Sequence, residues 1–249
     1  MADILEASAI DRHLKRPHQL QVLPTVDSTN RLAKTQLLAG QTPDIILADH
    51  QTAGYGRQSR TFVSPGESGI YLSLVRPPVP LAQLPLVTPM LAVAAVQAIT
   101  AVAGLKPQIK WVNDLYLNHH KVAGILAENL DQGLILGIGI NFKANSALAA
   151  VEKAGFLLPE ATLVTRNQLI AAIINQVDLL WPQLVTGAFM DFYRQYSLLI
   201  GQTVTLQLGQ RTVVGQVNAI GAQGELILKD AHGLTAYTSG EVVHVLAWT

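Results

Sequence analysis

Two short segments of the sequence combine residue types that suit a site for negatively charged reactants. Residues 51–60 read Gln-Thr-Ala-Gly-Tyr-Gly-Arg-Gln-Ser-Arg, and residues 110–114 read Lys-Trp-Val-Asn-Asp. Glycine lets a backbone approach a ligand closely, and arginine presents a permanently charged fork that matches carboxylate or phosphate. Lysine adds a compact cation on a strand. A flexible cationic loop facing a fixed lysine would suit a reaction between two anions.

Each of these features also has a purely structural explanation when it is taken alone. The 51–60 segment is compatible with a solvated surface loop, and Lys110 with a strand-edge lysine whose ammonium reaches water. The Ser28–Asn30 segment is typical of a helix N-cap. The adjacent His119-His120 pair lies between two predicted strands and is typical of a solvated turn. Only their combination favours a functional site.

Composition and charge exclude several classes of protein. Of the 249 residues, 49% are hydrophobic and 14% are charged, which is typical of a globular chain with a large core. The formal net charge is zero, so no global basic field attracts nucleic acid, and we predict no nucleic-acid partner. The chain has no cysteine, which excludes thiol nucleophiles, disulfides and Fe–S clusters and fits a cytoplasmic location.

The most apolar run, Met90–Leu105, is interrupted by Gln97 and Thr100. It is shorter than the roughly 20 residues that a membrane span needs. We therefore predict a buried helix and no membrane association.

Two glycine patterns point to different structures. The segment from Gly54 begins like a dinucleotide fingerprint, but Arg60 stands where the third glycine should be, and no P-loop motif is present. Gly137 and Gly139 lie on a predicted strand, where glycine is unfavourable unless something approaches closely. That strand carries either a bulge or a ligand lying on the sheet.

Hydrophobic periodicity predicts two units, a larger domain over residues 1–198 and a small β domain over 199–249. The first contains a long helix over 86–102 and three consecutive strands joined as an antiparallel meander. The strands are expected at 108–117, 121–129 and 134–142. From residue 200 onward, short strands with glycine-rich turns predict a small barrel.

The motifs, in their order along the chain, resemble those of the biotin–protein ligases. The resemblance is carried by Val26–Asn30 (DSTN), Gln51–Arg60 (QxxGRGRxGR), Ser64–Gly66, Gly69–Ser73, Lys110–Tyr116 (KWPNDLY), Lys121–Leu126 (KxAGIL) and Gly137–Asn141 (GxGIN). Tyr55 and Ser59 replace the usual arginine and glycine of the loop, and Val112 replaces a proline.

This resemblance implies an α+β fold, with a catalytic domain like that of class II aminoacyl-tRNA synthetases, a mixed or antiparallel sheet and a C-terminal SH3-like β-barrel. It implies that biotin and ATP, with Mg²⁺, give biotinyl-5′-AMP, and that biotin then passes to a lysine of a carboxylase's biotin carrier domain. Few residues precede Asp27, which predicts the short type of the family, without an N-terminal DNA-binding domain. No protein motif for a metal is apparent, so Mg²⁺ is expected to arrive with ATP. A homodimer is compatible with the resemblance.

The resemblance also assigns the site. Lys110 and Arg57 are the expected catalytic residues, because fixed cations must offset the repulsion between a carboxylate and a phosphate. The expected biotin-binding residues are Ser28, Thr29, Asn30, Gln51, Tyr55, Gly56, Arg57, Lys110 and Gly124. The expected adenylate- or ATP-binding residues are Gly54, Arg57, Arg60, Phe62, Lys110, Asn113 and Asn141.

Two alternative functions remain open. A ligase or transferase for lipoate or octanoate would share the fold but need a longer apolar tunnel. A catalytically weak, biotin-binding paralogue would account for the replacements at Tyr55 and Ser59. Pyrophosphate release that depends on biotin and ATP separates the enzyme from the paralogue.

Overall fold

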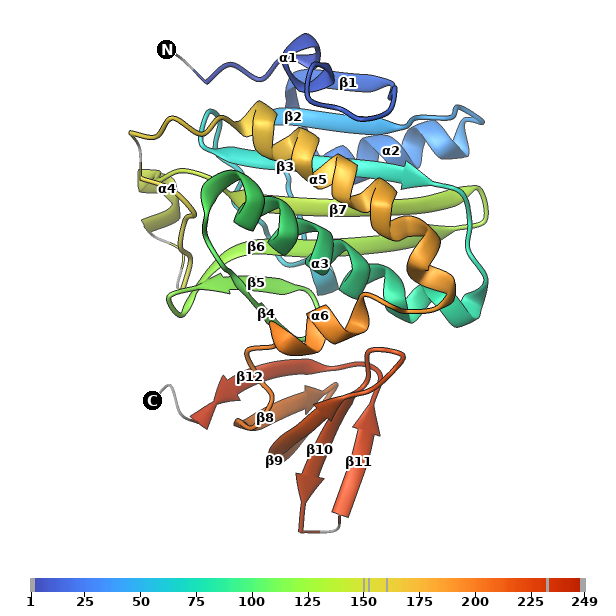
Figure 1. Ribbon diagram of the computed structural model, residues 1–249, viewed down its shortest axis with the longest axis vertical. Helices are drawn as coiled ribbons and strands as arrows, with labels where there is room; N and C mark the ends of the chain where they lie inside the picture. Colours follow the sequence, from blue (N-terminus) through green and yellow to red (C-terminus); the bar gives the residue numbers. More distant parts are fainter. Residues whose placement is uncertain (1–2, 150, 152, 160, 232, 247–249) are drawn as a thin grey trace.

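The computed structural model describes residues 3–149, 151, 153–159, 161–231 and 233–246, and shows a large α+β domain followed by a smaller β domain (Figure 1). The predicted fold class is confirmed. The domain boundary expected at residues 198 and 199 lies in the connection between the last helix of the first unit, which ends at Gln195, and the first strand of the second, which begins at Thr203.

A seven-stranded mixed sheet forms the centre of the large domain. Its order is β1-β2-β3-β7-β6-β5-β4, with β1 parallel to β2 and the other neighbours antiparallel. The strands are β1 (Leu20–Val26), β2 (Ile45–Gln51), β3 (Gly69–Arg76), β4 (Gln108–Lys110), β5 (Asp114–Leu117), β6 (His120–Leu130) and β7 (Gly133–Asn141). The predicted antiparallel meander is therefore confirmed, although its first expected strand is divided into β4 and β5.

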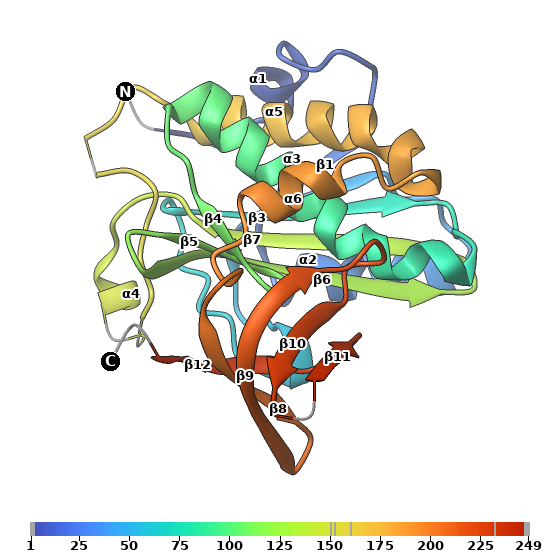
Figure 2. The same cartoon turned by 60° about the horizontal axis from the view of Figure 1, so that its bottom comes forward.

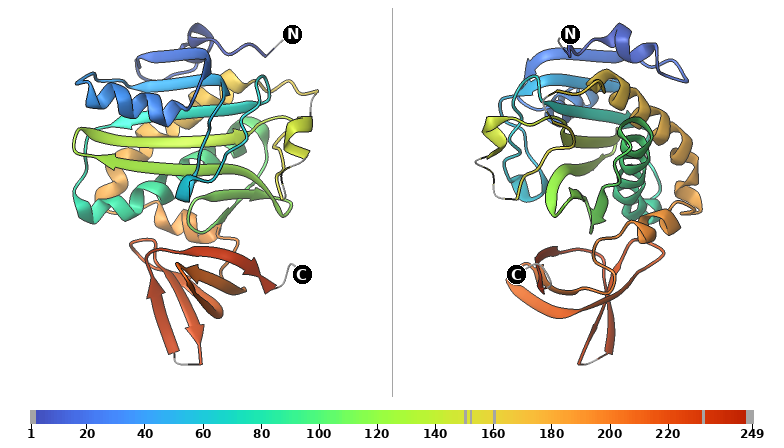
Figure 3. Two further views of the ribbon diagram at one scale, coloured as in Figure 1. Left: turned by 180° about the vertical axis from the view of Figure 1, so that it is seen from behind. Right: turned by 60° about the vertical axis from the view of Figure 1, so that its left-hand side comes forward.

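Helices cover both faces of this sheet. The α-helices are α1 (Ala7–Asp11), α2 (Thr29–Leu38), α3 (Leu84–Ala103), α4 (Ser146–Ala149), α5 (Arg166–Leu180) and α6 (Met190–Gln195). The short 3₁₀ segments are η1 (Arg57–Ser59), η2 (Leu81–Gln83) and η3 (Trp181–Val185). Helices α3 and α5 lie together on one face, and α2 lies on the other (Figures 1 and 3).

Helix α3 is long and apolar enough to cross a membrane by length and composition alone. In the fold it is mostly buried, and it packs against α5 and the sheet. The run from Met90 to Ile99 is almost entirely inaccessible to solvent, as expected for the central helix of a protein core. This agrees with the buried helix predicted from the sequence.

Strand alternation separates the two faces of the sheet. On β7, Leu134 and Leu136 belong to the main core beneath α3 and α5, whereas Ile135 packs with Ala33 and Leu37 of α2. Because successive side chains point to opposite faces, Gly137 and Gly139 share the α2 face with Ile135. The glycines therefore open space beside α2, on the face away from the main core.

The C-terminal domain is a five-stranded antiparallel sheet in the order β11-β10-β9-β8-β12. Its strands are β8 (Thr203–Leu208), β9 (Arg211–Ile220), β10 (Leu226–Asp230), β11 (Gly233–Tyr237) and β12 (Glu241–Val245). The expected barrel is corrected to an open sheet, because no pairing between β11 and β12 closes it within the described residues. The largely exposed β11 leaves one edge of the twisted sheet free (Figure 2).

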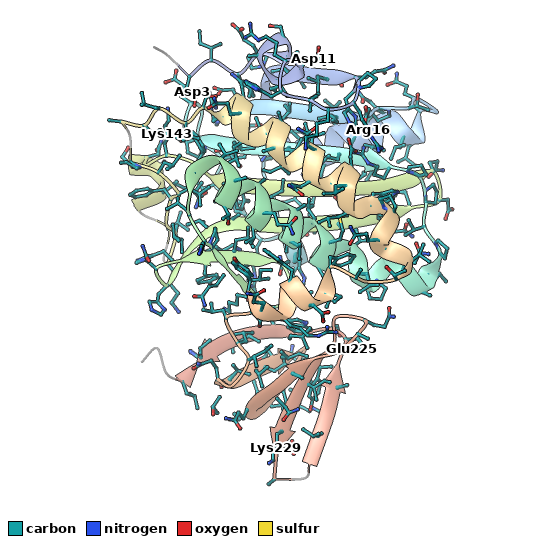
Figure 4. All side chains as sticks on the ribbon, viewed as in Figure 1. Asp3, Asp11, Arg16, Lys143, Glu225 and Lys229 are labelled. Atoms are coloured by element: carbon teal, nitrogen blue, oxygen red, sulfur yellow. The ribbon has the colours of Figure 1, made fainter. Side chains whose placement is uncertain are left out.

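Specific hydrogen bonds attach this domain to the larger one. The indole Nε1 of Trp111 donates to the carbonyl oxygen of Gly224 at 2.8 Å, and Nε of Arg194 donates to the carbonyl oxygen of Ile220 at 2.8 Å. At the other end of the molecule, Asp3 forms an ion pair with Lys143 at 3.4 Å (Figure 4). Because Trp111 follows Lys110 in the sequence, its bond to Gly224 places the C-terminal domain next to a candidate site residue.

Candidate active site

A pocket lies on the α2 face of the sheet, where the segment between β2 and β3 crosses over the strands (Figure 3). Its lining comes from α2, from loop 51–68, from β4 to β7 and from the start of β12. The predicted site residues found in it are Ser28, Thr29, Asn30, Gln51, Tyr55, Gly56, Arg57, Arg60, Phe62, Lys110, Asn113 and Gly124. Residues from widely separated motifs thus meet in one cavity.

The first turn of α2 forms one end of the pocket. Ser28 is the N-cap, and its Oγ accepts from the backbone N of Arg31 at 3.5 Å. Thr29 donates from its backbone N to Oε1 of Gln51 at 2.9 Å, and Nε2 of Gln51 donates to Oγ of Ser64 at 3.0 Å. The same residues therefore cap a helix and supply buried hydroxyl and amide groups to the cavity, so the structural and functional explanations hold together.

The two glycines of β7 make room for side chains of the pocket wall. A Cβ at Gly137 would lie 2.3 Å from Oδ1 of Asn30, and one at Gly139 would lie 2.4 Å from Cε1 of Phe62. Distances this short exclude any larger residue unless the neighbour moves. The space over these glycines is therefore filled by Asn30 and Phe62, and the described pairing of β7 with β3 and β6 shows no bulge there.

The loop arginines connect the two domains. Nη1 of Arg57 donates to Oδ1 of Asn113 at 3.2 Å, and Nη2 donates to the carbonyl oxygen of Gly240 at 3.2 Å. Arg60 makes a bidentate ion pair with Glu241, and the hydrogen bond from Arg60 lowers the pKa of that carboxyl group. The C-terminal domain thus contributes to the site through Glu241, which lines the pocket.

Two lysines reach the pocket, Lys110 from β4 and Lys121 from β6, with β5 between these strands. Lys110 has no carboxylate within ion-pair distance among the described residues, and burial lowers the pKa of its ammonium group. Its Nζ lies 5.5 Å from the centre of the Tyr116 ring. Lys121, by contrast, pairs through Nζ with Oδ1 of Asp114 at 2.7 Å. Lys110 is the cation better prepared to receive an anionic ligand, and Lys121 is a second one nearby.

Sequence reasoning missed Lys121, Asp114 and Glu241 as pocket residues. Lys121 and Asp114 lay inside the quoted motifs, and this was the signal that could have found them. In the structure, β5 pairs with β6 so that Asp114 lies opposite Gly124, which brings Lys121 close to Asp114. Glu241 had no such signal, because it lies in the other domain and only the tertiary structure brings it to Arg60.

Two predicted residues are not part of the lining. Gly54 lies inside the loop, where a Cβ would be 2.6 Å from Oγ of Ser64, so it allows the two segments of the loop to pack closely. Asn141 is buried at the end of β7, and its Nδ2 donates to the carbonyl oxygen of Gly155 at 2.8 Å. The adenylate contact expected of Asn141 stays a prediction.

Histidines and acids do not gather for a metal ion in the part of the chain that the structure describes. His119 lies in the β5–β6 turn with a positive φ of 64°, and Nδ1 of His120 lies 2.8 Å from the carbonyl oxygen of Asn118. The turn explanation of this pair therefore accounts for its geometry.

Comparison with known proteins identifies the class of the chain. Residues 22–145 match the model of the biotin/lipoate A/B protein ligase family, and residues 199–245 match that of the biotin protein ligase C-terminal domain. The biotin protein ligase of Aquifex aeolicus in complex with biotin and ATP superposes with a TM-score of 0.76 and 26% identity, over 90% of this chain and 97% of that one.

The relatives found by sequence are named as ligases. The biotin–[acetyl-CoA-carboxylase] ligase of Mycobacterium tuberculosis is 31% identical, over 91% of this chain and 89% of the relative. The bifunctional ligase/repressor BirA of Bacillus spizizenii is 32% identical, over 87% of this chain and 71% of the relative. This chain belongs to the biotin protein ligase family.

Proposed function

We propose that this protein is a biotin–[acetyl-CoA-carboxylase] ligase. The observation that carries the proposal is the convergence of Lys110, Lys121, Arg57 and Arg60 on one pocket whose other end presents hydroxyl and amide groups. A site with cations at one end and neutral polar groups at the other suits a substrate with a ureido ring and a carboxylate. The relatives from M. tuberculosis and Paracoccus denitrificans carry this activity in their names.

In the first half-reaction, the biotin carboxylate attacks the α-phosphorus of ATP, biotinyl-5′-AMP forms and pyrophosphate leaves. Both reactants are anions, so preorganised cations lower the barrier by offsetting charge that builds up in the transition state. Among the described residues no carboxylate lies within ion-pair distance of Lys110, which suits it to bridge carboxylate and phosphate. Arg57 can hold phosphate from the loop side through its guanidinium.

The neutral end of the pocket suits the ureido ring of biotin. Ser28 and Thr29 offer hydroxyl groups. Gln51 offers an amide nitrogen, which donates one N–H to Ser64 and can direct the other toward a ligand. A ureido group has both donors and an acceptor, so hydroxyl and amide groups match it. Trp111 supplies flat surface for the bicyclic ring, and the glycines of β7 make room for Asn30 and Phe62 in the pocket wall.

In the second half-reaction, a neutral lysine amine of the carrier attacks the acyl carbonyl of the anhydride. The bond from the acyl carbon to the phosphate oxygen breaks, AMP leaves and the amine loses a proton. Mg²⁺ is expected to enter with the ATP phosphates. The chain is expected to be cytoplasmic, as a monomer or a homodimer, and not to bind nucleic acid. A gel shift at physiological salt tests the last of these expectations.

The experiment combines biotin, MgATP and a purified biotin carrier domain, with the same domain carrying arginine at its acceptor lysine as control. We expect pyrophosphate release that requires biotin, followed by a gain of one biotin only on the lysine form. Parallel reactions replace biotin with lipoate or octanoate, and activation of either acid in preference to biotin would favour the alternative acyl ligase. Absence of any adenylate would favour the biotin-binding paralogue.

A further inference from the structure

Glu128 lies behind the pocket wall, and the assignments above give it no role. Its Oε2 accepts hydrogen bonds from Nδ2 of Asn30 at 2.8 Å and from the hydroxyl of Tyr55 at 2.8 Å. Both donors are neutral, and both belong to residues that line the pocket. One carboxylate therefore joins α2 to loop 51–68.

These two bonds extend a chain of polar contacts around the biotin end of the pocket. Ser73 connects Thr29 to Asn30. Its Oγ lies 2.8 Å from Oγ1 of Thr29 and 2.6 Å from Oδ1 of Asn30. Thr29 in turn donates to Gln51, the first residue of the loop. The chain thus begins at Gln51, crosses the fully buried Ser73 and returns to the loop at Tyr55.

Tyr55 holds the tip of the loop. Within the tip, the backbone N of Gly56 donates to the carbonyl oxygen of Arg60 at 2.8 Å, and Phe62 donates to that of Gly54 at 2.9 Å. This small hairpin touches the sheet at Phe62, beside Gly139, and at Tyr55, through Glu128. Tyr55 is thus its anchor to β6.

Tyr55 suits this task as a neutral donor. Burial and the bond to Glu128 raise the pKa of its hydroxyl, so it stays protonated and donates throughout the neutral range. Its ring also lies beneath the guanidinium of Arg31, whose Cζ is 5.4 Å from the ring centre. An arginine at this position, as in the motif that the loop resembles, would face Arg31 with a like charge.

We propose that Glu128 is a positioning residue, and that its hydrogen bond to Tyr55 keeps loop 51–68 closed over the biotinyl-adenylate. The proposal rests on the proposed function and deepens it. It explains how a chain with Tyr55 in place of arginine retains its intermediate, because the hydroxyl fixes the loop through Glu128. This bond adds to those of Arg57 with Asn113 and Gly240.

The test measures dissociation of biotinyl-5′-AMP from the wild type and from Tyr55→Phe. We expect dissociation to accelerate about tenfold, since hydrogen bonds to charged groups are among the stronger ones, and adenylate formation to slow by a smaller factor. Tyr196→Phe is the matched control. Its ring stacks on Phe192 in α6 at 4.3 Å, outside the pocket, and the variant should behave as wild type.

A double-mutant cycle shows whether Tyr55 acts through Glu128. In a Glu128→Ala background, Tyr55→Phe should change dissociation by less than about twofold, because the acceptor is already gone. Glu128→Gln keeps an acceptor oxygen and should recover part of what Glu128→Ala loses. A tenfold effect of Tyr55→Phe that persists in the Glu128→Ala background would overturn the proposal.

Amide hydrogen exchange of residues 54–62 in the ligand-free protein gives an independent readout, and Tyr55→Phe should accelerate it while exchange of β7 stays unchanged. If adenylate dissociation and amide exchange in Tyr55→Phe match those in Tyr196→Phe, the proposed role of the Glu128–Tyr55 hydrogen bond is wrong, while the proposed function stands. A wild-type protein that forms no biotinyl-adenylate would instead overturn the proposed function.

Discussion

Arg57 donates from Nη1 to Oδ1 of Asn113 at 3.2 Å, and this bond joins the two cationic segments of the chain. The loop arginine and the strand that carries Lys110 are far apart in the sequence but face the same cavity. Nη2 of Arg57 binds the carbonyl oxygen of Gly240, so the C-terminal domain takes part in the same contact. The predictions below follow from this arrangement.

Lys110→Ala should abolish adenylate formation in a protein that remains folded. Removing one preorganised charge costs on the order of 3–4 kcal/mol in a transition state of this kind. Pyrophosphate release in the presence of biotin and ATP measures the effect. Lys121→Ala is the comparison: because Asp114 already neutralises Lys121, we expect a smaller loss. A larger loss for Lys121→Ala than for Lys110→Ala would reverse the assignment of the two lysines.

Arg57→Ala should release the intermediate. Without this guanidinium, the loop loses its bonds to Asn113 and Gly240 together with a cation for the phosphate. Biotinyl-5′-AMP would then escape and modify accessible lysines of bystander proteins, such as added albumin. Arg211→Ala, at an exposed position of β9 outside the pocket, is the matched control and should not label albumin. Equal labelling by wild type and Arg57→Ala would show that the loop does not retain the adenylate.

The pH dependence should reflect the burial of Lys110, which lowers the pKa of its ammonium below the ordinary 10.5. The cation is the active form, so kcat/KM for adenylation should fall as pH rises through that lowered pKa. An anionic ligand favours the charged form, so the same limb in kcat should lie at higher pH. Lys110→Arg stays charged and should lose the descending limb. An unchanged limb in Lys110→Arg would assign it to another group.

Gly139→Ala should weaken the site by displacing Phe62, because the added methyl group would lie 2.4 Å from its ring. We expect a higher KM for biotin and ATP and a loss of roughly 1–3 kcal/mol in the free energy of unfolding, the usual cost of overpacking. Adding Phe62→Ala removes the clash and should restore the stability but not the KM. Wild-type stability in Gly139→Ala alone would mean that Phe62 does not rest on this glycine.

Much of the fold could be predicted from local pattern. The meander of β5, β6 and β7 follows from three apolar runs with short links, and α3 from a long apolar run bounded at its end by Gly104. Helix α5 begins at Arg166, where Thr165 and Gln168 form a capping box. The open edge of the C-terminal sheet could not be predicted, since in the described part of the chain β12 pairs with β8 and not with β11, its neighbour in the sequence, and no local pattern indicates that choice.

The site was predictable to the extent that its residues lie in compact motifs. Ser28, Gln51, Arg57 and Lys110 were chosen from residue type and motif, and they meet in the pocket. Glu241 and Glu128 were not found, because both act through tertiary contacts, Glu241 with Arg60 and Glu128 with Asn30 and Tyr55. Such contacts leave no periodic or motif signal in one sequence.

The identity of the activated acid tests the account most directly. The protein is incubated with MgATP and equal concentrations of biotin, lipoate and octanoate, and the adenylates are identified by mass spectrometry. We predict that biotinyl-5′-AMP is the dominant product and that it disappears in Lys110→Ala. Lipoyl- or octanoyl-adenylate as the main product, or no adenylate from the wild-type protein, would contradict the proposed function.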